Sequence, residues 1–559
     1  MTKRRCLAVL TLVAASGCSS LSEEGPSTAP PTIRGSVAPI EQNRDVQSGE
    51  HLFIELSKVA PSSAGFAYED DRLTIYIADE RDRPMAEAFV QEAVRTRRIL
   101  PPGGGKRIGG IGTRKVAHSY QELAAYRTQV ADLLLGKDHE LHFVDLDERA
   151  NTVTLGYSGD ESALIAKVRK DLPAARTASW LRVERSQRLV LDKMRNTPIS
   201  GVTLAPASLT AQADTIVGGL MITRLKPDGT TGGCTLGFTA KRNNVVGFVT
   251  NSHCTEDMFG MGGPNFRAFG QLHSRIIGSE AVDPYGYTCG VAPPTECRGS
   301  DAAWIQSNLA VPYRVGFLAK PASRNTGALN ISQSEPYIRI ASTGTAAAGT
   351  TVEKFGMVTG WTSGYLTHTC VTSMIWDDGF WKRVACADKT LYHADEGDSG
   401  GPVWLWLPYN PSEGGTQASL LGIHASREWE GNSKYFSRID RILSDLEGTW
   451  EILGPVPSSP LQAWIWGWTD VSSSASCQLS YSAHATGGAG GYTFSSITTD
   501  GTVVNSGSNT IVVAFSTSGS HWVHVTVTDA AGMTASRTFT VQSEASNNEC
   551  YGAPFGNPF

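Results

Sequence analysis

The stretch VVGFVTNSHC, residues 245–254, indicates how the central part of the chain folds. Its first six residues are mostly β-branched or aromatic, which favours a short buried strand, and a His and a Cys follow closely. Similar short runs alternate with Gly-rich turns from Ile216 to about Leu453. We therefore predict an all-β barrel or sandwich domain over residues 214–453.

A second all-β unit is predicted downstream, after the Gly-Pro-Val-Pro stretch at 454–457. Alternating apolar and polar residues at 521–529 and 535–542 predict two neighbouring strands. A segment of about 85 residues with short strands suits an immunoglobulin-like β-sandwich. We assign this sandwich to residues 457–543, and a tail follows at 544–559.

Upstream, residues 48–213 contain no Cys and have the pattern of an α/β domain. Apolar residues at helical spacing predict helices, and two alternating stretches around the polar Asp-Glu-Arg-Ala-Asn predict a hairpin. The expected helices span 83–100, 120–135 and 163–172, and the hairpin strands span 140–146 and 152–157. The small, polar residues 195–213 predict an exposed linker.

The first 18 residues have the pattern of an export signal. Basic residues at 3–5 precede an apolar stretch at 7–15 that is too short to span a bilayer. Small residues before Cys18 resemble a bacterial lipoprotein processing site, which predicts a lipid anchor on Cys18; an ordinary signal peptide is the alternative. Residues 19–47 predict a disordered tether. We expect a secreted or cell-envelope protein without a membrane-spanning segment.

Composition excludes some classes of function. The net charge of −6 over 559 residues gives no argument for nucleic-acid binding. Two of the ten cysteines lie in the export signal, and the even number that follows predicts disulfides in an exported chain. Zinc is the alternative, but the sequence has no CxxC pair, so we expect no metal and no cofactor. The remaining cysteines are Cys234, Cys254, Cys289, Cys297, Cys370, Cys386, Cys477 and Cys550.

The sharpest chemical signal is Gly397-Asp398-Ser399-Gly400-Gly401-Pro402. A serine hydroxyl needs a neighbouring base to act as a nucleophile, and the oxyanion formed by its attack needs N–H donors. Glycines on both sides let the backbone turn tightly. We predict Ser399 as the nucleophile, with the N–H groups of Gly397 and Ser399 as the oxyanion hole.

Two further motifs supply a base and an acid. His253 follows a predicted buried strand, and Cys254 can fix its loop. Asp301 precedes the apolar Ala-Ala-Trp-Ile, where a buried carboxylate can hold an imidazole in one tautomer. We predict His253 as the general base and Asp301 as the residue that orients it.

The order His, Asp, Ser with these flanks resembles the chymotrypsin-like serine proteases, above all their secreted bacterial branch, the alpha-lytic protease and streptogrisin group. Ile216-Val-Gly-Gly resembles the start of the mature enzymes, and Cys234-Thr-Leu-Gly-Phe resembles their first disulfide loop. The stretch 352–364 resembles the segment before the second-barrel disulfide. The resemblance covers 216–445, and residues 144–153 resemble the hairpin of that group's pro-regions.

The resemblance implies a serine endopeptidase made as a zymogen, with two six-stranded antiparallel barrels and the site between them. It implies that residues 48–213 are a pro-region that inhibits the enzyme within the same chain and aids its folding. We expect polypeptide substrates and a monomer. The implied disulfides are Cys234–Cys254, Cys289–Cys297 and Cys370–Cys386, and Cys477–Cys550 would close the C-terminal unit, although eight cysteines alone allow many other pairings.

One position departs from the group. Its bacterial members often carry an Arg after the segment that matches 355–356, where it neutralises the buried Asp before the nucleophile; here Met357 stands in that place. A buried unpaired carboxylate is costly, so Asp398 needs another partner. We expect either Lys354 or the amine of Ile216, freed by cleavage of the chain.

The group builds its primary specificity pocket from positions that match His393, Glu396 and the strand 422–426. Glu-specific relatives carry a His at the position of His424, where an imidazole can donate a hydrogen bond to a substrate carboxylate; His393 and Ser426 would be further donors. Glu396 would repel an acidic residue instead. The pocket therefore predicts a preference either for Glu or for neutral side chains, and cleavage after Lys or Arg is not expected.

Three alternatives stay open. The chain could be a protease-like binding protein, although the intact triad argues against it. An esterase could use the same triad, although the order His–Asp–Ser and the all-β pattern argue against an α/β-hydrolase. The C-terminal unit could be an adhesion module in which Trp464, Trp466 and Trp468 form a binding patch rather than core packing.

Overall fold

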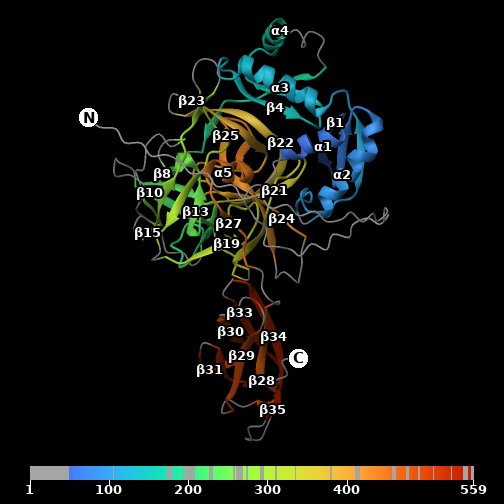
Figure 1. Cartoon of the computed structure of the whole chain (residues 1–559). Helices are drawn as coiled ribbons and strands as arrows, with labels where there is room; N and C mark the ends of the chain where they lie inside the picture. Colours follow the sequence, from blue (N-terminus) through green and yellow to red (C-terminus); the bar gives the residue numbers. More distant parts are fainter. Residues whose placement is uncertain are drawn as a thin grey trace, which may run out of the picture. The chain divides into compact units, whose positions relative to one another are not determined.

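Figure 1 shows the computed structural model of the whole chain. The chain divides into two compact units, Met1–Glu41 and Gln42–Phe559, and every described residue belongs to the second. The predicted export signal, Cys18 and the tether therefore lie outside the described residues. The structure describes residues 49–545 and 552–555, except for 105, 173–178, 193–194, 197–207, 226–230, 256–257, 260–267, 272–274, 290–294, 309–310, 334, 378–379, 409–415, 456–460, 474–476, 487, 489–491, 508 and 530–531.

The described part of the chain is mainly β, as the sequence predicts. Its strands form sheets of three, nine, fifteen and eight strands. Helices gather in the first part of the chain, drawn in blue and teal in Figure 1, and the red C-terminal part consists of strands. None of the described helices is both long and apolar enough to cross a membrane.

Local capping signals explain where the helices begin. The Ser119 hydroxyl accepts the N–H of Glu122, whose carboxylate in turn accepts the N–H of Ser119, so that a capping box starts α3. The Asp160 side chain caps α4 in a similar way. The helix that the sequence predicts over 83–100 ends at Arg95, and the helix at Gly49–Val59 was not predicted. The helices are α1 Gly49–Val59, α2 Arg83–Arg95, α3 Tyr120–Leu134 and α4 Glu161–Asp171, with a 3-10 turn at Glu80–Asp82.

Two small β structures accompany these helices. The three-stranded sheet has the order β1-β2-β3, with β1 Ser63–Glu69, β2 Arg72–Ile77 and β3 Ile111–Lys115. The predicted hairpin forms, because β4 Leu141–Asp147 pairs antiparallel with β5 Thr152–Tyr157, and Asn151 in its turn has a φ of 56°. Asn tolerates this left-handed conformation better than most residues. Strand β6 Leu181–Arg185 runs parallel to β5.

The nine-stranded sheet carries the stretch 245–254 from which the all-β fold was predicted. Phe248 of β13 lies opposite Ile305 of β18, and both side chains belong to a buried apolar cluster with Phe269. The sheet order is β27-β12-β13-β18-β15-β14-β10-β11-β8. Its strands are β8 Arg195–Asn196, β10 Met221–Leu225, β11 Thr231–Thr235, β12 Phe238–Arg242, β13 Val245–Thr250, β14 Ala268–Gln271, β15 Arg275–Val282, β18 Ala303–Ser307 and β27 Trp450–Glu451.

The fifteen-stranded sheet follows the path β16-β17-β23-β26-β25-β24-β21-β22-β4-β5-β6, with β7, β9, β19 and β20 paired beside it. Helix α5, Ile439–Leu446, packs its apolar face into the buried cluster of Trp304 and Trp404. The strands not yet given are β7 Leu189–Leu191, β9 Ile216–Gly218, β16 Tyr287–Cys289, β17 Thr295–Arg298, β19 Tyr313–Ala319, β20 Tyr337–Thr343, β21 Thr351–Gly356, β22 Gly360–Asp377, β23 Phe380–Thr390, β24 Pro402–Trp406, β25 Gln417–Glu428 and β26 Lys434–Arg438.

These two sheets are larger than the six-stranded barrels that the resemblance implies. Strands β4 to β8, which all precede residue 197, pair directly or through one another with strands of the later part of the chain. Strand β4 pairs with β22, strand β7 with both β22 and β25, and strand β8 with β11. Two barrels of six strands stay a prediction.

The prediction of an exposed linker over 195–213 is wrong for Ser208 and Leu209, which are buried, whereas Gln212 is exposed. Strand β8 pairs with β11, and Leu209 is fully buried in a cluster with Val217 and Phe317. Ser208 forms an isolated bridge with Asn330. Small, polar composition predicts little side-chain burial, but it does not exclude backbone hydrogen bonds to a distant strand, and these decide the structure here.

The last sheet comprises the C-terminal strands, in the order β30-β33-β34-β28-β29-β32-β31, with β35 paired to β28. Alternate residues of β33, Val523, Val525 and Val527, are buried, as expected for a strand with one covered face. An immunoglobulin-like sandwich stays a prediction. The strands are β28 Gln462–Ser473, β29 Leu479–Thr486, β30 Thr493–Thr499, β31 Thr502–Ser506, β32 Thr510–Ala514, β33 Gly519–Thr528, β34 Thr534–Ala545 and β35 Gly552–Phe555.

Candidate active site

Ser399 lies in the loop between β23 and β24, and neighbouring glycines allow the turn that presents it. Gly397 and Gly400 have φ values of 99° and 84°, a region that L-residues with side chains rarely adopt. A Cβ atom at Gly400 would lie 2.2 Å from the carbonyl oxygen of Thr235. The loop is fixed from this side as well, because the N–H of Thr235 donates to the Ser399 carbonyl at 2.8 Å. Glycine is therefore required by the backbone at 397 and 400.

His253 lies in the 3-10 turn Ser252–Cys254 that follows β13. Cys254 forms a disulfide with Cys234 of β11, which anchors this turn. Asp301 lies two residues before β18, the strand that pairs with β13, so the sheet brings Asp301 and His253 together. The Asn251 side chain donates to the Asp301 carbonyl at 2.6 Å and links the two loops further.

The three side chains form one hydrogen-bonded chain. Nδ1 of His253 lies 2.5 Å from Oδ2 of Asp301, and Nε2 lies 2.8 Å from Oγ of Ser399. The second oxygen of Asp301 accepts the backbone N–H of His253 at 3.2 Å. All three residues are buried. This is the arrangement in which a carboxylate fixes the tautomer of an imidazole that faces a hydroxyl.

Burial and charge act in opposite directions on His253. Burial favours the neutral imidazole, but the adjacent Asp301 carboxylate favours the imidazolium through its charge and its hydrogen bond. Burial is the largest single effect, but Asp301, together with smaller contributions from Asp377 and Asp192, outweighs it, so the pKa of His253 is raised above its ordinary value. A more basic imidazole accepts a proton more readily from a hydroxyl at hydrogen-bond distance.

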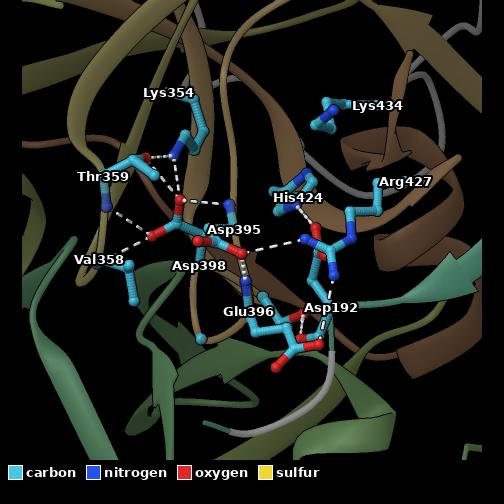
Figure 2. Close-up of polar contacts among 12 residues, drawn as sticks. Asp192, Lys354, Val358, Thr359, Asp395, Glu396, Asp398, His424, Arg427 and Lys434 are labelled. Carbon is cyan, nitrogen blue, oxygen red and sulfur yellow. Dashed lines mark hydrogen bonds and ion pairs between the residues drawn. The ribbon is translucent and has the colours of Figure 1, made fainter. Parts of the chain in front are cut away.

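Asp398, next to the nucleophile, pairs with Lys354 (Figure 2). Lys354 Nζ lies 2.6 Å from Oδ2, and the N–H groups of Val358 and Thr359 donate to Oδ1 at 2.9 and 3.2 Å. Burial alone would raise the pKa of Asp398, but Lys354 and these donors hold it below its ordinary value. The second expected partner, Ile216, instead donates its N–H to the carbonyl of Pro312 in this uncut chain.

The residues expected in the specificity pocket have different surroundings. His424 is fully buried on β25, whereas the side chains of His393 and Glu396 are exposed. Ser426 is buried, and its hydroxyl has no hydrogen-bond partner among the described residues. Glu396 pairs with Arg427, whose NH2 group lies 3.2 Å from its carboxylate. Of the four residues, His424 alone contacts the acidic side chain described next.

Two residues that the sequence reasoning missed complete the site, Asp192 and Arg427 (Figure 2). Strand β7 lies antiparallel to β25, and the next residue, Asp192, places its carbonyl oxygen 2.5 Å from Oγ of Ser399. Its carboxylate lies 2.6 Å from Nε2 of His424 and 2.9 Å from Nε of Arg427. Asp192 belongs to the region assigned as the pro-region, and nothing in the local sequence indicated contact with a residue 232 positions later.

Disulfides are formed where the resemblance implies them, as far as the structure describes the cysteines. Cys234–Cys254 and Cys370–Cys386 are both present, and Cys297 is disulfide-bonded. The side chain of Cys289, and Cys550 as a whole, lie outside the described residues. Glu50 lies beside Cys370 and Cys386, but the disulfide between these sulfurs removes them as thiolate ligands for a metal.

Two tryptophans of β28 have partners within the C-terminal sheet, and both are partly exposed. Trp464 stacks on His484, with ring centroids 5.9 Å apart, and Trp468 packs against the buried core of its sheet. The side chain of Trp466 lies outside the described residues. Core packing therefore accounts for Trp468.

No protein-family model and no curated protein sequence matches the chain. Part of the chain is similar to solved structures of serine proteases. Protease A of Thermobifida fusca is 18% identical, with a TM-score of 0.29 over 43% of this chain and 100% of that one. A chymotrypsin of Cellulomonas bogoriensis is 20% identical, with a TM-score of 0.28 and the same coverage. A glutamic acid-specific serine protease, described as using a histidine triad in substrate binding, is 19% identical, with a TM-score of 0.27 over 41% and 96%.

Proposed function

We propose that the protein is a serine endopeptidase that hydrolyses peptide bonds through an acyl-enzyme. This proposal rests on one observation: the backbone carbonyl oxygen of Asp192 contacts the hydroxyl of Ser399. Oγ of Ser399 lies 2.8 Å from Nε2 of His253 and 2.5 Å from the carbonyl oxygen of Asp192. A nucleophile, its base and a carbonyl group of the class that it would attack are thus in contact.

The mechanism follows from these positions. The carboxylate of Asp301 holds the Nδ1–H tautomer of His253, which leaves Nε2 to take the proton of Ser399 as Oγ attacks the carbonyl carbon. The imidazolium is stabilised by Asp301 and then protonates the leaving amine. We assign the N–H groups of Gly397 and Ser399 to the oxyanion, as donors set by the glycine-dependent turn. Water completes the reaction by the same route.

The first prediction tests the nucleophile. We expect Ser399→Ala to lower peptide hydrolysis by roughly a million-fold and to abolish labelling by a fluorophosphonate probe, while Ser363→Ala, which changes a partly exposed serine bonded to Asn325, keeps both. Turnover is measured on casein fragments and labelling by mass spectrometry of the modified peptide. If the Ser399→Ala chain keeps a tenth of the activity, the proposal is wrong.

The same experiment separates the alternatives. A binding protein that only resembles proteases would leave Ser399 unlabelled. An esterase would be labelled, but it would turn over ester substrates and not the matched amides. Peptide hydrolysis together with labelling supports the endopeptidase.

We further propose that residues 48–213 act as a pro-region in the same chain. The support is that β7 pairs with β25 and β22, so that Asp192 covers Ser399, which would block other substrates. We propose that the protein is exported and that its C-terminal sheet is a separate module. Intact-mass measurement of the exported protein tests both ends of the chain and the lipid on Cys18.

A further inference from the structure

The segment 189–192 lies in the candidate active site as an extended peptide. Leu191, Val190 and Leu189 pair with Ser426, Arg427 and Glu428 of β25 in an antiparallel register. Adding a strand to a sheet edge is a general way to bind a peptide, because backbone hydrogen bonds supply affinity and side-chain pockets supply specificity. All four residues of the segment are buried.

The register places one particular bond at the nucleophile. The carbonyl oxygen that accepts the Ser399 hydroxyl at 2.5 Å belongs to Asp192, the residue that follows β7. Further along the chain, β8 pairs with β11, the strand that carries Cys234. The chain is therefore paired with the central sheets on both sides of Asp192, as a bound substrate would be.

The side chain of Asp192 occupies a subsite with one hydrogen-bonding imidazole and one guanidinium that forms an ion pair with it. Nε2 of His424 lies 2.6 Å from one carboxylate oxygen, and Nε of Arg427 lies 2.9 Å from the other (Figure 2). The Tyr392 hydroxyl lies 3.0 Å from Nδ1 of His424 and donates to it, which leaves the ring with its proton on Nε2, toward Asp192. The carboxylate and the His424 ring are fully buried.

Two acidic side chains of the same site, Asp395 and Glu396, hold the guanidinium of Arg427. NH1 of Arg427 lies 3.0 Å from the Asp395 carboxylate, and NH2 lies 3.2 Å from that of Glu396. Two acidic residues that would repel a substrate carboxylate are thus paired with the guanidinium, and they hold it in place.

We propose that this subsite selects aspartate before the cleaved bond, and that the bond on the carboxyl side of Asp192 is the chain's own first substrate. This inference rests on the proposed function. It names Arg427, with His424, as the residue that sets specificity, and it assigns the substrate class as peptides with an acidic residue, Asp above Glu.

Size and charge decide between the possible side chains. Asp192 pairs with His424 through one oxygen and forms an ion pair with Arg427 through the other, so an apolar side chain would leave a buried imidazole N–H without an acceptor and the guanidinium without this counter-charge. Glu is one methylene longer, and His424 is held from its other side by Tyr392, so the ring cannot retreat without losing that bond. Asn keeps the shape of Asp but loses the charge-assisted contacts.

The proposed step balances without a co-reactant other than water. Oγ of Ser399 forms a bond to the carbonyl carbon of Asp192, its proton passes to Nε2 of His253, and the C–N bond on the carboxyl side breaks as His253 protonates the amine. Water then attacks the ester, gives a proton to His253, and Ser399 regains its hydroxyl proton. The products are the α-carboxylate of Asp192 and a new amino terminus.

The first experiment follows self-processing of the full chain by intact mass. We expect a cut after Asp192 in the native chain and none in Ser399→Ala. Asp192→Asn should slow this cut by roughly a hundredfold or more, and Asp192→Glu by less, because buried donors discriminate strongly against a partner that cannot pair with them. Arg427→Gln should slow it in the same way, and the double variant with Asp192→Asn should be little slower than either single variant.

The second experiment reads specificity without the native segment. Fluorogenic amides of Leu-Val-Leu-Asp, Leu-Val-Leu-Glu, Leu-Val-Leu-Asn and Leu-Val-Leu-Leu are compared, with rates referred to fluorophosphonate-labelled sites. We expect kcat/KM to fall in that order from Asp to the neutral peptides. Arg427→Gln should lower the Asp rate by roughly a hundredfold and so bring it toward the rate of the Leu peptide. The control Lys241→Gln, which removes a lysine paired with the exposed Glu451, should change neither.

Failure of the two proposals gives different results. If Ser399 is labelled and peptides are cleaved, but the Leu and Asn peptides are turned over as fast as the Asp peptide, the subsite does not recognise the carboxylate and this inference is overturned. A cut elsewhere in the chain with none after Asp192 overturns the self-processing part. Absence of labelling and of all cleavage overturns the proposed function, and the inference with it.

Discussion

Lys354 and Asp398 form a fully buried ion pair next to the nucleophile. Each is expensive to bury as an ion, and burial lowers the pKa of Lys354 in spite of the Asp398 charge. Asp398 also accepts hydrogen bonds from the Thr359 hydroxyl and from three backbone N–H groups, those of Val358, Thr359 and Asp395. Since this carboxylate is adjacent in sequence to Ser399, the ion pair fixes the backbone from which the oxyanion donors project.

Removing one member of this pair should cost more than removing both. We expect Lys354→Met to lower the free energy of unfolding by about 3–5 kcal/mol, because it leaves a buried carboxylate unpaired, and Lys354→Met with Asp398→Asn to recover most of this loss. Urea unfolding of the Ser399→Ala chain measures it. The exposed pair Lys241–Glu451 is the control, and Lys241→Met should cost about 1 kcal/mol or less. An equal loss in the single and double variants would contradict the assignment.

At the scale of elements, the β4–β5 hairpin carries acidic groups into the interior. Asp145 and Glu148 are each 1% exposed, and neither oxygen of Asp145 has a hydrogen-bond partner among the described residues. Burial, followed by the neighbouring Asp147 charge, raises the pKa of Glu148 to about 8, and burial raises the pKa of Asp145 well above its ordinary value. The hairpin pairs with β22, so these carboxyl groups affect how it is held there.

This hairpin should make the chain less stable as the pH rises. The folded pKa of Glu148 lies above the unfolded value, so its contribution is complete below about pH 4.5 and is lost as the pH rises toward 8. The full effect is on the order of 5 kcal/mol. We expect Glu148→Gln in the Ser399→Ala chain to reduce the loss of stability between pH 5 and 8, measured by urea unfolding. Asp145 would still titrate, so some loss should remain.

A matched change on the surface is the control for this titration. Glu161 begins helix α4 and is exposed, so Glu161→Gln should keep the native dependence on pH. An unchanged slope between pH 5 and 8 in Glu148→Gln would show that the Glu148 carboxyl is already ionised in the folded chain.

At the scale of the whole molecule, the sequence predicts those parts of the fold and of the site that depend on neighbouring residues in the chain. The residues around His253 and Ser399 identify two of the side chains that the structure brings together. The turn at Ser399 requires glycines on both sides, and His253 follows the buried strand β13, so both signals are local in the sequence. Lys354 was one of two candidates for Asp398, since a buried carboxylate demands a cation. The contact of Asp192 with His424 and Arg427 was missed, because it joins distant segments by strand addition, which leaves no periodic signal in either one.

The arrangement of the upstream strands predicts how the chain folds. The later part of the chain without residues 48–192 should lack partners for the edges of β22 and β25, and we expect it to refold with little activity. Adding residues 48–192 as a separate polypeptide should increase the yield of fluorophosphonate-labelled sites. Refolding to full activity from a chain that starts at Ile216, with nothing added, would refute a folding role for this region.

Strand pairing on both sides of Asp192 makes cleavage there a nick rather than a release. The segment before the cut stays paired with β25 and β22, and β8 after it stays paired with β11. The nicked molecule would be two polypeptides in denaturing electrophoresis and a single particle in gel filtration. Before the cut, the peptide bond keeps the segment that ends at Asp192 at a high effective concentration near the active site. Cleavage removes this tether and leaves the strand pairing in place. Dilution, or digestion of the detached fragment, then determines when the active site becomes open.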